Sequence, residues 1–71
     1  MKRDNYNYLI SNIILSKQTF KYNDILNEIK TIFNDDSDYA VQVLNEALIR
    51  MTCCGFLTIL GNTYTVLYIK I

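Results

Sequence analysis

The sequence contains no histidine, carries no net charge and has no long apolar run, and each absence excludes a class of protein. Without histidine, the chain lacks the side chain that most often serves as general base and as metal ligand. Seven lysine and arginine residues balance seven aspartate and glutamate residues, which excludes a generally basic nucleic-acid binder. No segment approaches the roughly 18 apolar residues of a membrane span, and no apolar region follows the basic first residues, so we do not expect a cleaved secretory signal. We therefore expect a non-catalytic protein of the cytoplasm, with no membrane contact.

Cysteine is scarce as well. The only two, Cys53 and Cys54, are adjacent, so they cannot cross-link distant parts of the chain. Structural zinc sites need spaced pairs of ligands, which adjacent cysteines do not supply. We expect two small, partly buried thiols in a reducing cytoplasm, and neither a metal nor a cofactor.

Catalytic motifs are also missing. The chain has no nucleophile elbow, no glycine-rich phosphate loop and no spaced set of metal ligands. The acidic residues Asp35, Asp36 and Asp38 lack the glycine and the distal glutamate of a calcium-binding loop. We therefore expect that the protein is not an enzyme.

What the chain does contain is apolar surface for a small core. Hydrophobic residues make up 51% of the sequence and charged residues 20%, a composition that excludes intrinsic disorder. No proline, repeat or low-complexity run marks a linker, so we expect one domain over residues 1–71. A domain of this size buries only about 60% of its unfolded surface, so association with another chain stays open.

Three segments have the 3.6-residue apolar period of amphipathic helices. We expect Asp4 to cap the first helix and Asn23 to cap the second, while Gly55 ends the third in a left-handed conformation. Between the first two helices, residues 19–22 suit a very short strand or an extended linker. The three apolar stripes are Tyr6, Leu9, Ile10, Ile13 and Ile14, then Ile25, Leu26, Ile29, Ile32 and Phe33, then Val41, Leu44, Leu48 and Met51 with Ala40 and Ala47.

The last part of the chain changes to the period of a strand. Residues 56–60 and 63–69 flank Gly61 and Asn62, a pair that fits a tight primed turn, so we expect a hairpin in which Leu60 pairs with Thr63. Alternation then divides the hairpin into two faces. We expect the face of Leu57, Ile59, Tyr64, Val66 and Tyr68 to cover the helices, and that of Phe56, Thr58, Leu60, Thr63, Thr65 and Leu67 to be partly wet.

This order of elements resembles the winged helix-turn-helix superfamily over nearly the whole chain. The closest local match starts in the third helix and continues into the hairpin, from Leu44, Leu48 and Met51 through Gly55-Phe56-Leu57-Thr58-Ile59 to Gly61-Asn62-Thr63-Tyr64-Thr65-Val66. The resemblance implies an α+β fold, a small winged helix-turn-helix with three helices and a C-terminal two-stranded β-hairpin wing.

Most winged helices bind DNA, with the third helix in the major groove and the wing against the neighbouring backbone. By that resemblance the protein would be a transcriptional regulator, working as a homodimer. Glutamine and asparagine on the third helix would pair with adenine edges, and lysines of the earlier segments would contact phosphates. The residues that the resemblance assigns to DNA contact are Lys17, Lys21, Lys30, Gln42, Asn45, Arg50 and Asn62.

The distribution of charge points away from that docking mode. Residues 24–46 hold one lysine and six carboxylates, a net charge of −5, whereas residues 1–23 sum to +3 and residues 47–71 to +2. The acidic middle segment is the helix-turn-helix itself, and the wing from residue 56 to residue 69 has no basic residue. Non-specific DNA affinity depends on Lys and Arg against phosphates, so this surface would repel a duplex.

Our leading hypothesis is therefore a non-enzymatic regulatory or accessory module that docks on a protein, such as a nucleic-acid-processing enzyme or regulator with a basic groove. A short, Asn-, Ile- and Tyr-rich protein of this kind fits a phage or mobile-element factor. The same acids could equally be helix caps, and the amides solvated surface. A third alternative is a dimerisation module or structural piece of a larger complex, which would use the surface of Phe56, Leu60, Leu67 and Ile71. The candidate protein-binding residues are Asp35, Asp36, Asp38, Tyr39, Gln42 and Glu46.

Overall fold

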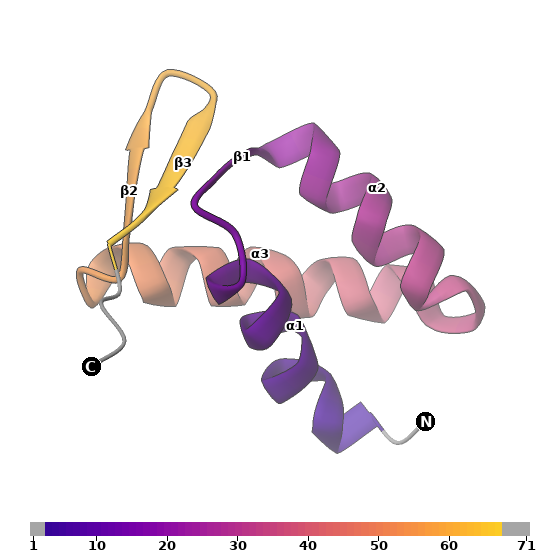
Figure 1. The fold of residues 1–71 in the computed structure, drawn as a ribbon. Coiled ribbons are helices and arrows are strands. Elements are labelled where there is room, and N and C mark those ends of the chain that lie inside the picture. Colours follow the sequence, from indigo (N-terminus) through magenta and orange to yellow (C-terminus); the bar gives the residue numbers. More distant parts are fainter. Residues whose placement is uncertain (1–2, 68–71) are drawn as a thin grey trace.

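The computed structural model describes residues 3–67, which form helices followed by a C-terminal antiparallel hairpin (Figure 1). This mixed α+β arrangement has a winged-helix-like layout and confirms the predicted fold class. The elements are η1 (Arg3–Asn5), α1 (Tyr6–Leu15), β1 (Thr19–Lys21), α2 (Tyr22–Ile32), η2 (Asn34–Asp36), α3 (Ser37–Cys53), β2 (Leu57–Leu60) and β3 (Thr63–Val66).

The two predicted N-caps are wrong. The N-cap of α1 is Asn5, because Asp4 lies within the preceding 3-10 turn η1. The N-cap of α2 is Lys21, whose extended backbone (φ −96°, ψ 150°) joins β1 to the helix without an intervening loop. Neither cap residue makes a side-chain capping hydrogen bond. The prediction followed the preference of Asp and Asn for caps, and here the adjoining elements set both helix starts.

The hairpin has the predicted register. Leu60 pairs with Thr63, and Ile59 lies opposite Tyr64. Gly61 has φ +62° and no non-glycine residue in the described range has positive φ, so the turn fits the II′ class, with glycine first. The structure adds a pairing that the sequence did not predict: β1 pairs antiparallel with β3, so residues 19–21 complete a three-stranded sheet in the order β1-β3-β2.

The hydrophobic core lies where α1 and α2 pack against α3 (Figure 1). Two details of the predicted stripes differ. On α3, Val43 is buried and Val41 only half-buried, because the inward face is rotated from the one predicted, and on α2 Ile32 remains 47% exposed. The buried set is Tyr6, Ile10, Ile14, Phe20, Ile25, Ile29, Phe33, Ala40, Val43, Leu44, Ala47, Leu48, Met51 and Leu57.

The hairpin covers the helices only at one end. Leu57 is 2% exposed, and the ring of Tyr64 stacks on Phe20 with centroids 5.1 Å apart. Ile59 is 49% exposed, although it was predicted to cover the helices, because the turn end of the hairpin extends beyond α3 (Figure 1). The opposite face is open to solvent as predicted, with Leu60 85% exposed. Tyr68 lies outside the described residues.

Candidate functional site

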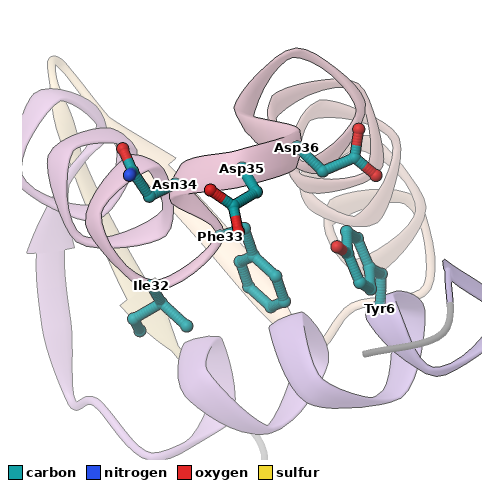
Figure 2. Close-up of a pocket in the computed structure, with 6 residues that line it drawn as sticks. All are labelled: Tyr6, Ile32, Phe33, Asn34, Asp35 and Asp36. Atoms are coloured by element: carbon teal, nitrogen blue, oxygen red, sulfur yellow. The ribbon is translucent and has the colours of Figure 1, made fainter.

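The predicted acidic residues gather at the corner between α2 and α3. Asp35 and Asp36 lie in η2, and Asp38 lies in the first turn of α3. Asp35 and Asp38 are exposed and Asp36 is half-buried. Figure 2 shows the carboxylates of Asp35 and Asp36 above the aromatic rings of Tyr6 and Phe33, at the edge of a shallow depression of about 360 Å³. The corner therefore combines negative charge with an aromatic floor.

Tyr39 packs beside that aromatic floor through its contact with Tyr6. It is half-buried, and its ring centroid lies 5.5 Å from that of Tyr6. Tyr6 also contacts Phe33, with ring centroids 4.5 Å apart. This aromatic group ties the start of α1 to the corner of α2 and α3, so Tyr39 has a clear packing role.

The remaining candidates for protein binding continue along α3. Gln42 and Glu46 are exposed, and Asp38, Gln42 and Glu46 follow one another at intervals of four residues, which places all three in one row on the helix. Asp36 is the N-cap of α3 but makes no side-chain capping hydrogen bond. Asp38, in the first turn, is favourably placed against the helix dipole. We give the name acidic row to the four acids that run from η2 onto the exposed side of α3, namely Asp35, Asp36, Asp38 and Glu46.

Three of the residues assigned to DNA contact are engaged within the protein. The Lys17 Nζ atom lies 2.8 Å from a carboxylate oxygen of Glu28. Arg50 Nη2 donates to the side-chain oxygen of Asn7 on α1, at 2.7 Å. Asn45 accepts a hydrogen bond from the Tyr22 hydroxyl, also at 2.7 Å. Each bond orients the side chain and uses part of its hydrogen-bonding capacity, so only its remaining donors are open to a phosphate or a base.

Part of the DNA-contact set does converge. Lys21 and Asn62 line one depression of about 480 Å³, between the start of α2 and the tip of the hairpin. Tyr22 lines it too and joins it to Asn45 through their hydrogen bond. Asp24 lies in the same depression, where its charge opposes that of Lys21. Lys30 stands apart, exposed in the last turn of α2.

A groove between α3 and the hairpin was not predicted. It has a volume of about 250 Å³ and is lined mainly by apolar atoms. Ile49, which the helical period places outward, is 65% exposed there, and Ile59 approaches it from β2. The helical period indicated that Ile49 is exposed, but Ile59 was expected to be buried against the helices, so the groove was missed. The lining residues are Leu48, Ile49, Thr52, Cys53, Ile59 and Tyr64, and we call this site the α3–wing groove.

The cysteines are free thiols, and both Cys53 and Cys54 are exposed rather than partly buried. They come after Met51, the last buried residue of α3, and lie outside the core. Among residues 3–67, no three histidine, cysteine, aspartate or glutamate side chains are grouped to hold a metal ion. In the same range, no helix has the length and apolar character to cross a membrane.

Comparisons of the chain with protein-family models, with curated proteins and with solved structures find no match.

Proposed function

We propose that this chain is a non-enzymatic member of the winged helix-turn-helix superfamily that acts by binding a protein partner. The carrying observation is the exposed face of α3, which in a DNA-binding relative would enter the major groove. This face carries Asp38, Glu46 and the apolar Ile49. Arg50, the one cation of α3, is held toward α1 by its hydrogen bond to Asn7.

The wing supports the same proposal. Residues 56–67 contain no charged side chain, so the hairpin offers nothing that neutralises a phosphate. Instead, Ile59 and Leu60 expose apolar surface at the turn end. Acidic residues beside an apolar surface suit a basic protein surface, such as the nucleic-acid-binding groove of an enzyme or regulator, which the module would block or recruit.

Affinity capture from nuclease-treated host extract tests this proposal. We expect the wild-type chain to retain a protein, and the retention to fall as salt rises, because exposed charge pairs are screened. Replacing Asp35, Asp36 and Asp38 together by Asn removes three carboxylates, each contributing about 0.2–1 kcal/mol in an exposed pair, so we expect about tenfold weaker binding. Asp4→Asn, at an exposed acid in η1, is the control. Retention that neither salt nor the triple change affects would contradict the electrostatic part.

The alternative, a dimeric DNA-binding regulator, has one specific observation in its favour. Lys21, Asn62 and the Tyr22–Asn45 pair meet around one depression, beside the helix that would read bases. A fluorescence-anisotropy titration with random duplex at low salt separates the two functions. Saturable binding that weakens steeply with salt, and further in a Lys17→Ala/Lys21→Ala variant, would favour DNA.

A further inference from the structure

We propose that the α3–wing groove receives an apolar side chain from a basic amphipathic helix of the partner protein. This inference rests on the proposed protein-binding function and names the part of the partner that the site recognises. The groove lies between two exposed isoleucines, Ile49 at 65% and Ile59 at 49%, above the buried Leu48. Covering both isoleucines with an apolar side chain removes that surface from water, which is the usual source of affinity for a helix seated in a groove.

The charges around the groove determine which residues of the partner helix are favoured beside its apolar side chain. Glu46 precedes Ile49 by three residues on α3, so it lies one helical turn from the groove, and Asp38 lies further along the same face. At the hairpin end, Ile59 and Tyr64 also line the next depression, where Asp24 and Lys21 carry opposite charges, so the net negative charge beside the groove comes from α3. Cations spaced one turn from an apolar anchor would therefore meet carboxylates, so the groove favours a helix with Lys or Arg flanking its apolar stripe.

The cation nearest to the groove in sequence is directed elsewhere. Arg50 follows Ile49 directly, but its guanidinium donates to Asn7 on α1, and neither residue lines the groove. The groove lining itself contains no charged residue. An incoming cationic helix thus meets no cation in the groove lining, whereas a phosphate backbone would meet an apolar floor with the Glu46 carboxylate one helical turn away.

A second copy of the chain fits this groove less well. In a two-fold dimer both copies bring the same acidic face of α3 into one interface, and the groove lining supplies no cation to pair with Glu46. Like charges at that position oppose association. The charge pattern therefore favours a partner of opposite sign over self-association.

A designed peptide is the direct probe. We would titrate a labelled leucine–lysine peptide with helical apolar spacing, a scrambled peptide of identical composition, and a version with glutamate in place of lysine. We expect saturable binding of the helical leucine–lysine peptide only. Ile49→Ser should weaken it about tenfold, Ile59→Thr should weaken it in the same direction, and Glu46→Gln should weaken it and reduce its salt dependence. The matched control is Tyr8→Ser, which removes a 70% exposed apolar side chain from α1 and should change the affinity less than twofold.

The outcomes separate this inference from the proposed function. Equal binding of the scrambled peptide, or unchanged affinity in both isoleucine variants with unchanged urea midpoints, overturns the groove inference. If the host protein is still captured in a manner that depends on the acidic row, the proposed function survives that result. Random duplex that binds saturably and displaces the peptide overturns both. Sedimentation of the free chain as a dimer that Ile49→Ser dissociates would assign the groove to a second copy instead.

Discussion

At the residue scale, two isoleucines of α2 lie on neighbouring turns in opposite surroundings. Ile29 is fully buried and Ile32 is 47% exposed. Ile29→Ala removes methyl groups from the core and leaves a cavity, so we expect a loss of about 2–4 kcal/mol in the free energy of unfolding. Ile32→Ala, the same change on the same helix, should cost less than about 1 kcal/mol. Urea unfolding measures both.

A domain this small has only about 3–5 kcal/mol to lose, so Ile29→Ala could unfold it outright. Ile29→Val is then the informative variant, with an expected loss of about 0.5–1.5 kcal/mol. Equal losses at positions 29 and 32 would contradict the burial that the structure assigns to α2.

The bond between Tyr22 and Asn45 is a second residue-scale feature. It joins the start of α2 to the exposed side of α3, with 2.7 Å between the hydroxyl and the amide oxygen. Tyr22→Phe removes the donor alone, and since the site is exposed we expect a loss of about 0.5–1 kcal/mol. In a double-mutant cycle with Asn45→Ala, the two changes should be non-additive. Strict additivity would show that the bond contributes nothing in solution.

At the element scale, the end of α3 depends on a glycine. Gly55 has φ +84°, a left-handed conformation that ends the helix before β2 begins. No atom lies within 4 Å of where its Cβ would stand, so any penalty of a side chain there is backbone strain alone. We expect Gly55→Ala to destabilise the fold by about 1–2 kcal/mol and Gly55→Asn by less, because asparagine tolerates this region better. Thermal unfolding would test the order, and a harmless Gly55→Ala would contradict it.

Elements fixed by neighbouring residues were predictable, and those fixed by distant contacts were not. The register of Leu60 with Thr63 follows from a two-residue turn and strict alternation, both local properties. The pairing of β1 with β3 joins Phe20 to Tyr64, and no local pattern specifies such a partner. Both N-cap predictions were wrong for the same reason. The preceding turn and strand determine where the helices start, and the nearest Asp or Asn does not.

The candidate site likewise has features that local spacing predicts and features that depend on distant contacts. The outward positions of Gln42, Glu46 and Ile49 follow from the helical period, and the structure places each of them at the surface. The hydrogen bond of Arg50 to Asn7 spans 43 positions and could not be read from spacing. The α3–wing groove likewise depends on how far the hairpin extends beyond α3.

At the scale of the whole molecule, opposite charges are segregated along a neutral chain. The segment with a net charge of −5 forms α2, the corner and most of α3, while residues 56–67 are uncharged and apolar at the turn. Together they form a face that is acidic along α3 and apolar where α3 meets the wing. Such a face matches a basic amphipathic surface and opposes a nucleic-acid backbone.

Photo-cross-linking from a photoreactive amino acid at position 49 identifies directly the molecule that contacts this face. In host cells we predict that position 49 cross-links to a protein and that neutralising the acidic row reduces this cross-linking. Position 8 on α1, where Tyr8 is 70% exposed and Ile49 is 65% exposed, is the control, and we predict that it forms no such adduct. Nucleic acid as the main adduct at position 49 would contradict the account.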